Sequence, residues 1–244
     1  MRRRAILGAA AAAAATGVTR AAFAAGTPAP LAVLGRPAPT FEAADTEGRL
    51  RRLGEFPGKV VVLEWTSPSC PFAAAQYASG RMQELQKWAA QNGVVWLSVL
   101  SSHPSRPDYL DAKAAAAFDR QRGAAPAALL MDESGRMGHA YGAMTANHMF
   151  VIDRRGTLVY AGGIDDAEST KPDEVRVAHN HVRAALEDLL AGRPVKKAES
   201  EPAGCAISYA SRRWTSRLAC ARRFGSCASL PLRRALLLPT GKPR

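Results

Sequence analysis

The sequence has few cysteines, and their spacing excludes two common uses of this residue. The 244-residue chain contains four: Cys70, Cys205, Cys220 and Cys227. Ala73 stands where the second cysteine of a C-x-x-C motif starting at Cys70 would be, so this local disulfide cannot form. Cys220 and Cys227 have six residues between them, which matches no usual zinc-ligand spacing.

Acidic residues are absent from both ends of the chain. Residues 1–24 carry four arginines and residues 210–244 carry nine Lys or Arg, and neither segment has an Asp or Glu. Residues 25–209 hold 20 basic and 21 acidic side chains, so the net charge of +12 comes from the two ends. A nucleic-acid-binding domain carries its positive charge on the folded part. The sequence therefore predicts no nucleic-acid partner.

The N-terminal apolar run is too short for a retained membrane span. It extends from Ala5 to about Val18, after three arginines and before the small residues around Ala22–Ala24, which is the pattern of a secretory signal peptide. The alternative is an Ala-rich arm that stays on the protein. A leader predicts a periplasmic or secreted protein in an oxidising compartment, with no stable membrane insertion after cleavage.

These features divide the chain into four predicted segments. They are a signal peptide over 1–24, a linker over 25–33, one domain over 34–209 and a basic tail over 210–244. The length suits a single domain with a full core. The tail shows no sustained period of 2 or 3.6 residues. It is either a basic arm for a membrane surface or an acidic partner, or a disordered or unselected extension, which we favour.

The most informative stretch that is present is KVVVLEWTSPSCPF, residues 59–72. Its branched apolar run predicts a central strand, and Pro71 suits the first turn of a helix. Cys70 is thereby expected at a helix N-terminus, where backbone N–H groups and the helix dipole stabilise a thiolate. This placement favours a redox role over the alternative, a small buried hydrophobe.

The remaining pattern predicts an α/β domain without internal repeats. A hairpin is expected over 41–53, turning at Thr46-Glu47-Gly48. Strands are expected over 94–101, 127–131, 148–153 and 157–162, and helices over 71–78, 81–91, 109–122, 136–141 and 175–191. Ser79 is expected to cap the second of these helices.

Four motifs make the chain resemble a known family. They are GRPAPTFEAADTEG (35–48), the Cys70 stretch, HMFVIDRRGTLVYAGGIDD (148–166) and HNHVRAALEDLLAGRPV (179–195). Over residues 34–209 the chain is similar to thioredoxin-like redoxins related to alkyl hydroperoxide reductase and thiol-specific antioxidant proteins. The resemblance implies a thioredoxin fold, with a central mixed sheet, flanking helices and an N-terminal β-hairpin extension.

The resemblance also implies roles for residues near Cys70. Peroxiredoxin loops read P-x-x-x-T-x-x-C, and here Leu63 takes the Pro position and Ser67 the Thr position, so only the hydroxyl is kept. Ser67 or Thr66 is expected to supply hydrogen bonds to a peroxide. The active-site arginine of that family has no assignable counterpart.

Four more residues are predicted to line the substrate groove: Pro71, Asn147, His148 and Trp65. Asn147 stands where the thioredoxin fold usually has a cis-proline, so we expect a trans bond there, with Asn147 as a turn residue or a hydrogen-bond donor to a ligand. His148 either tunes the pKa of Cys70 or is a core residue, the reading we favour. Trp65 is expected to pack more than to bind substrate.

Cys205 is the natural second thiol, because it is the only other cysteine in the predicted domain and relatives carry a similar terminal Gly-Cys segment. It is predicted either to resolve or bridge Cys70, or to stay unpaired or link two molecules. The five histidines and the pair Asp165 and Asp166 do not have the pattern of a metal site or a catalytic carboxylate pair. We predict no cofactor and no metal.

Three functions fit this sequence. The first is an exported thiol-dependent peroxidase, in which Cys70 attacks a small-molecule hydroperoxide and Cys205 or an external thiol resolves the sulfenate. The second is thiol–disulfide exchange with a protein or low-molecular-weight thiol through Cys70, alone or with Cys205. The third is a catalytically weak scaffold that binds a partner.

Overall fold

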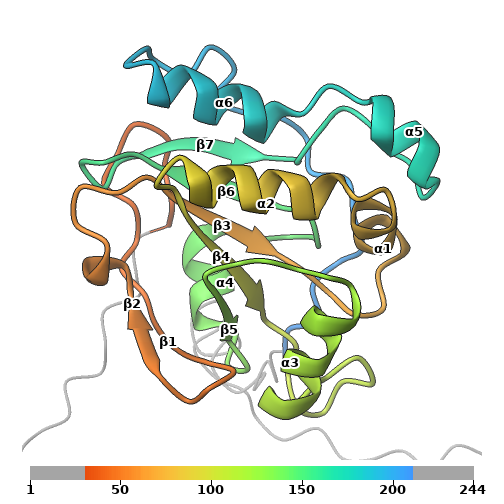
Figure 1. Cartoon of the computed structure of the whole chain (residues 1–244). Helices are drawn as coiled ribbons and strands as arrows, with labels where there is room; N and C mark the ends of the chain where they lie inside the picture. The colour runs from red at the N-terminus through yellow and green to blue at the C-terminus, as the bar shows by residue number, and fades with distance from the viewer. Residues whose placement is uncertain (1–30, 211–244) are drawn as a thin grey trace, which may run out of the picture.

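The computed structural model describes residues 31–210, which fold around one seven-stranded sheet (Figure 1). The predicted signal peptide, most of the linker and the tail beyond Ala210, with Cys220 and Cys227, lie outside the described residues. The strands are β1 (Glu42–Asp45), β2 (Leu50–Arg52), β3 (Val61–Trp65), β4 (Val95–Leu100), β5 (Ala128–Met131), β6 (Met149–Ile152) and β7 (Leu158–Gly162). The helices are α1 (Pro71–Ala78), α2 (Arg81–Gln91), α3 (Ala112–Gln121), α4 (Arg136–Tyr141), α5 (Pro172–Val177) and α6 (His181–Leu190), with a 3-10 turn η1 (Leu53–Glu55).

The sheet is mixed, with the order β2-β1-β5-β4-β3-β6-β7. Strands β3, β4 and β5 are parallel, whereas β6 and β7 on one side and β1 and β2 on the other are antiparallel to their neighbours. This is the predicted thioredoxin-like architecture, and the β1–β2 hairpin is its predicted N-terminal extension. Every residue of β3 is buried, which explains its unbroken apolar run.

Two hydrophobic layers cover the sheet, because successive residues of β3 point to opposite faces. Val62 packs with α2 and α6 on one face, and Leu63 and Trp65 pack with α4 on the other. Figure 1 shows α2 and α6 crossing one side of the sheet while α4 lies behind it. The carboxyl end of β3, where Cys70 follows, therefore emerges between two packed layers.

Most predicted elements are confirmed, including both helices after Cys70, but three local predictions were wrong. The 175–191 helix is two helices, because α5 ends at Val177, Ala178 is extended and the Asn180 side chain caps α6 by accepting from Arg183 N–H at 2.7 Å. Helix α3 starts at Ala112, since Asp111 caps it.

The third wrong prediction concerns the cap of α2. Its N-cap is Gly80, which has a φ of 81°. Ser79 instead donates its hydroxyl to the carbonyl of Gln76 at 2.8 Å and accepts only a longer bond, 3.3 Å, from Arg81 N–H. A left-handed residue turns the chain sharply between α1 and α2, and glycine adopts this conformation without strain.

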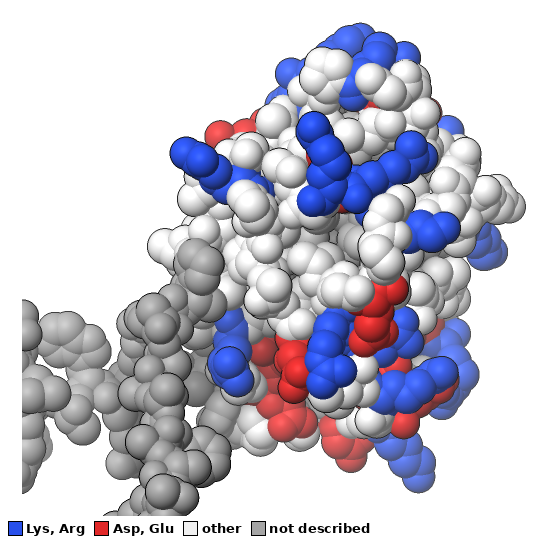
Figure 2. Space-filling view, turned by 90° about the vertical axis from the view of Figure 1, so that its left-hand side faces the viewer, with Lys and Arg blue, Asp and Glu red and all other residues white. Residues whose placement is uncertain are grey.

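Charged side chains of both signs are interleaved on the β1–β2 hairpin. Arg49 pairs with Glu47, Arg51 with Asp45 and Arg52 with Glu42. Figure 2 shows acidic and basic groups side by side in the lower part of one face. The Arg49–Glu47 and Arg52–Glu42 pairs are exposed and contribute little to stability, whereas Asp45 is buried. The mixture of signs agrees with the near-neutral charge of residues 25–209. Within residues 31–210, no helix has the length and apolar character needed to cross a membrane.

Candidate active site

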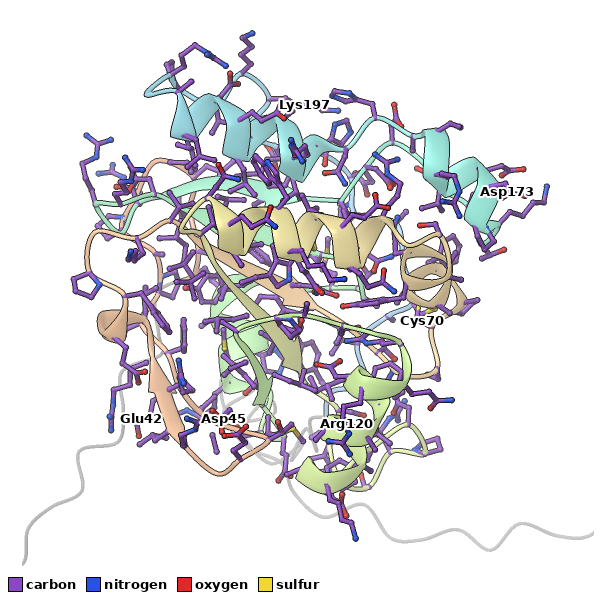
Figure 3. All side chains as sticks on the ribbon, in the orientation of Figure 1. Glu42, Asp45, Cys70, Arg120, Asp173 and Lys197 are labelled. Carbon is purple, nitrogen blue, oxygen red and sulfur yellow. A yellow bond between two sulfur atoms is a disulfide. The ribbon has the colours of Figure 1, made fainter. Side chains whose placement is uncertain are left out.

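Cys70 is the N-cap residue of α1, as the sequence predicted, and Pro71 occupies the first turn. The Cys70 carbonyl accepts the first helical hydrogen bond, from Ala74 N–H at 2.9 Å, while its own backbone is extended. Figure 3 marks this position at the start of the helix. The side chain is 1% exposed and packs against Ala73 and Ala146. The sulfur thus lies at the positive end of a helix, in a nearly closed apolar pocket.

Cys205 is joined to Cys70 by a disulfide, the pairing that the sequence left open. The two Cα atoms are 5.5 Å apart although 135 residues separate them in the chain. The backbone N–H of Cys205 also donates to the Cys70 sulfur at 3.1 Å. Cys205 therefore contacts the Cys70 sulfur through its backbone as well as through the S–S bond.

Cys205 is carried by an extended segment, residues 198–209, which we call the C-terminal strap. Figure 1 shows it, in blue, passing the start of α1. Next to Cys70 it pairs with the chain before β6: Ala146 N–H donates to the Cys205 carbonyl at 2.9 Å, and Thr145 and Ala206 form an antiparallel bridge. Gly204 packs on the Ala146 carbonyl so closely that a Cβ atom would overlap it. The strap is therefore seated by backbone pairing as well as by the disulfide.

Thr66 and Ser67 begin the loop between β3 and α1. The Thr66 hydroxyl is buried and accepts a bond of 2.8 Å from Arg122 Nη1. The Ser67 hydroxyl lies 3.3 Å from that of Ser69. Thr66 thus has a protein partner in this structure, and Ser67 is the hydroxyl nearer to solvent.

Arg122 is the residue near this loop that sequence reasoning missed. It follows α3, donates to the Asp119 carboxylate, and has its guanidinium carbon 3.8 Å from the Tyr77 ring centroid and 4.2 Å from that of Phe118. Burial raises the pKa of Asp119, and the Arg122 charge opposes that rise. The only signal in the sequence was an arginine before the helix-ending Gly123, which does not indicate which loop it reaches.

A hollow of about 590 Å³ opens beside the Cys70 loop, between α1 and the end of α3. It is lined by Ser67, Pro68, Ala73, Ala74, Tyr77, Ala78, Phe118, Gln121 and Arg122. Ala73, which packs against Cys70, forms part of its wall. Ala73, which replaces the second cysteine of a C-x-x-C motif, thus lies between the Cys70 sulfur and this hollow.

A buried carboxylate, Glu64, lies at the end of β3 on the α2 side. It is fully buried and accepts hydrogen bonds of 2.7–3.0 Å from Tyr77, Gln86, Trp96 and Ser98. Burial and the nearby Glu64 charge raise the pKa of Tyr77 well above its usual value, so this phenol stays a hydrogen-bond donor. Because each carboxylate oxygen has donors, the network fixes α1 and α2 to the centre of the sheet.

Trp65 and His148 do not line a groove at Cys70. Trp65 is fully buried among Tyr141 and Phe150, and its indole N–H donates to Ser101 at 2.9 Å. Alternation along β3 explains this, since residue 65 points to the α4 face. His148 stacks on Phe150 with centroids 4.4 Å apart, and burial lowers its pKa to about 4. It is a neutral core histidine, the reading favoured from the sequence.

Pro71 is exposed and Asn147 is 2% exposed, so of the four predicted groove residues only Pro71 is open to solvent. Among residues 31–210 all peptide bonds are trans, as expected at Asn147, which has a φ of 63° and donates its N–H to the Trp65 carbonyl at 2.8 Å. Asn147 is thus a turn residue, and its buried Oδ1 has no protein partner among the described residues.

Asp165 and Asp166 hold turns near the start of α6 through hydrogen bonds. Asp165 accepts from Gln76 of α1 at 2.8 Å, and Asp166 accepts from the backbone N–H of His179 at 2.8 Å. His179 and His181 lie on either side of the α6 N-cap, with ring centroids 5.3 Å apart. Within residues 31–210, no group of three or more His, Cys, Asp or Glu is arranged to hold a metal ion.

Comparison with known proteins identifies the family. The sequence model of the AhpC/TSA family matches residues 34–161, more than half of the chain and including Cys70. The chain belongs to the AhpC/TSA family. This AhpC/TSA protein is accordingly an oxidoreductase of the thioredoxin-like redox class. The family match ends before the strap, so Cys205 is placed by the structure alone.

Solved structures agree on the fold of this AhpC/TSA protein. A hypothetical protein from Sinorhizobium meliloti 1021 is 24% identical, with a TM-score of 0.64, and the alignment covers 75% of this chain and 98% of the other. An uncharacterized conserved protein from Geobacillus kaustophilus is 25% identical, with a TM-score of 0.65 and coverage of 75% and 95%. No curated protein matches the sequence.

Proposed function

We propose that this protein reduces hydroperoxides, with Cys70 as the attacking thiol and Cys205 as the resolving thiol. The disulfide between the α1 N-cap cysteine and the strap cysteine is the observation that carries the proposal. A peroxidase that lacks a C-x-x-C pair needs a second thiol that can reach the first. Membership of the AhpC/TSA family supports peroxide over other oxidants.

The chemistry takes two steps on the protein. The Cys70 thiolate attacks one peroxide oxygen, the O–O bond breaks, and the leaving alkoxide takes up a proton to become an alcohol while Cys70 becomes a sulfenic acid. The Cys205 thiolate then attacks the Cys70 sulfur, the S–O bond breaks as the disulfide forms, and the leaving hydroxide takes up a proton to become water. Two electrons from an external thiol reductant restore both thiols.

Cys70 is suited to the first step because its surroundings favour the anion. The N-terminus of α1 and the Cys205 N–H both face the sulfur, so we expect its pKa to lie below the free-thiol value of about 8.5. Ser67 or Thr66 is proposed to donate a hydrogen bond to the peroxide. Thr66 would have to do so while keeping its bond from Arg122.

The proposal is tested by adding one equivalent of hydroperoxide to the fully reduced protein and mapping the peptides by mass spectrometry. The wild type is expected to give the Cys70–Cys205 disulfide, and Cys70→Ser to consume no peroxide. Cys205→Ser is expected to give sulfenic acid at Cys70, which a second equivalent of peroxide converts to sulfinic acid. The double variant C220S/C227S is the matched control and should behave as the wild type. A Cys70→Ser protein that consumed peroxide at the wild-type rate would contradict the proposal.

A second candidate, thiol–disulfide exchange, is favoured by how the strap is seated. Its backbone pairs with residues 145 and 146 beside Cys70, so an extended cysteine-containing peptide from another protein has a comparable place to bind. Reduction of insulin or of a glutathione mixed disulfide, without steady-state peroxide consumption, would select this activity.

We also propose that the protein is exported, either to the periplasm or out of the cell, with the mature chain beginning near residues 25–26. The support is the leader pattern of residues 1–24. N-terminal sequencing of the protein from its native cell is the test, and a chain that still begins at Met1 would contradict export.

A further inference from the structure

The C-terminal strap is held at both ends by contacts that do not involve either sulfur. Before Cys205 it lies along the edge of β7, where Ala161 N–H donates to the Ala198 carbonyl at 3.0 Å and Ser200 N–H donates back at 3.3 Å. The Ser200 hydroxyl lies 2.7 Å from that of Tyr160 and accepts from Gly163 N–H at 3.0 Å. This end of the strap forms one parallel bridge with β7, between Glu199 and Ala161.

After Cys205 the strap ends on α4. Ile207 N–H donates to the Met144 carbonyl at 3.0 Å, and His103 N–H donates to the Ser208 carbonyl at 3.1 Å. The Tyr209 ring stacks on His139 with centroids 4.3 Å apart and planes 28° apart, and its hydroxyl donates to the Ala143 carbonyl at 2.8 Å. Burial raises the pKa of Tyr209, so its hydroxyl keeps the proton that it donates.

The Tyr209 ring fits only because two residues beneath it lack side chains. A Cβ atom at Gly135 would lie 2.7 Å from the ring, and one at Gly138 would overlap the ring and its hydroxyl. Gly138 is inside a helix, where alanine is normally the better residue. A glycine there is accounted for by the close approach of Tyr209.

We propose that Tyr209 is a positioning residue that holds Cys205 over Cys70 in the reduced as well as the oxidised protein. Three residues lie between Cys205 and Tyr209, so a fixed Tyr209 and a fixed Ser200 leave the Cys205 segment little freedom. A thiol held in place has a high effective concentration toward its partner. The strap then stays in place when the disulfide is reduced. Cys205 can therefore attack the Cys70 sulfenate without refolding of this segment.

A positioning role for Tyr209 deepens the proposed function. The kinetic experiment below rests on the proposed peroxidase activity, whereas the main test, a disulfide equilibrium, does not. The reaction measured is the exchange of the Cys70–Cys205 disulfide with two glutathione thiols to give the dithiol and glutathione disulfide. The full-length protein is equilibrated in glutathione buffers of defined ratio, and the oxidised fraction is read by alkylation and mass spectrometry.

Tyr209→Ala is expected to lower the equilibrium constant for forming the disulfide about tenfold, which is about 30 mV for this two-electron couple. Tyr209→Phe keeps the ring and should recover most of that loss. Gly138→Ala changes no residue of the strap but displaces the Tyr209 ring from the α4 side of the contact. It should therefore lower the equilibrium constant for forming the disulfide as well. Gly54→Ala is its control, because a Cβ at Gly54 meets nothing within 4 Å.

The kinetic part compares what an excess of peroxide does to each variant, because oxidation of the Cys70 sulfenate to sulfinic acid uses a second peroxide molecule. Tyr209→Ala should form the Cys70 sulfenate at the wild-type rate but divert more of it to sulfinic acid, because resolution is slower. If Tyr209→Ala and Gly138→Ala are folded by circular dichroism and both keep the disulfide constant within twofold of wild type, the inference is wrong. A shifted constant in a protein that consumes no peroxide would instead leave the inference standing and overturn the peroxidase proposal.

Discussion

Arg122 shows how one side chain ties the loop before Cys70 to the end of α3. Its guanidinium binds Asp119 and Thr66 and lies against Tyr77 and Phe118, with only 9% of the side chain exposed. Both hydrogen-bond partners are buried and would lose a donor without it. Fifty-six residues separate Thr66 from Arg122, so no local pattern in the sequence connects them.

Arg122→Met is expected to lower the free energy of unfolding by about 2–4 kcal/mol, because it leaves a buried carboxylate without its counter-ion. Urea denaturation followed by tryptophan fluorescence measures the change. The control is Arg120→Met, two positions earlier on the exposed side of the helix, which should stay within about 0.5 kcal/mol of wild type. Equal stability of the two variants would contradict a supporting role for Arg122.

His148 makes stability depend on pH in the acidic range. Its pKa is about 4 in the folded protein, because it is buried, whereas the unfolded chain binds this proton near pH 6.5. The stabilisation is therefore complete above pH 6.5 and is lost as the pH falls toward 4. Between pH 7.5 and 4.5 the loss from this residue is about 2–3 kcal/mol.

His148→Gln should remove that part of the pH dependence, and the half-exposed His103→Gln should not. The measurement is the difference in unfolding free energy between pH 7.5 and 4.5 for each variant. If the wild type and His148→Gln lose the same free energy over this range, His148 is not buried in its neutral form.

At the scale of elements, the strap is the last segment of the part of the chain that the structure describes. It crosses the face beside Cys70 and makes its last described tertiary contacts through Tyr209. The sequence placed the domain end at residue 209 from its resemblance to redoxins, but it assigned no element to residues 198–209. The reason is that a strap held by main-chain bonds to distant strands needs no periodic pattern of its own.

Deletion of residues 211–244 is expected to leave the melting temperature and the Cys70 oxidation product unchanged. Deletion of residues 198–244 removes the strap and its disulfide, and should cost about 3–5 kcal/mol, since the cross-link closes a loop of 135 residues. Differential scanning calorimetry of the oxidised proteins compares them. A large loss of stability from the shorter deletion would mean that the basic tail belongs to the fold.

The break between α5 and α6 is set by a tertiary contact that the local sequence pattern does not show. The apolar spacing of 175–191 predicted one helix, but Arg81 of α2 donates to the carbonyls of Val175 and Ala178 at 2.6 Å each and satisfies the end of α5. A tertiary donor at that point makes a helix end favourable. Asn180, which starts α6, was the local signal that could have shown the break.

For the whole molecule, the sequence by itself determined the class of fold, the place of Cys70 and the neutrality of the domain. These depend on local chemistry: a buried strand needs an apolar run, a helix N-terminus accepts proline, and a count of charges needs no coordinates. The same local reasoning predicted the order of most strands and helices along the chain. The family match over residues 34–161 agrees with the predicted class of fold.

Only the tertiary structure decided which residues meet at Cys70. It joined Cys205 to Cys70 and brought Arg122 to Thr66. Each of these depends on how elements far apart in the chain pack, and on which face of the sheet a residue falls. Because such contacts are set by the whole core and not by neighbouring residues, the sequence predicted the attacking thiol but left its partners open.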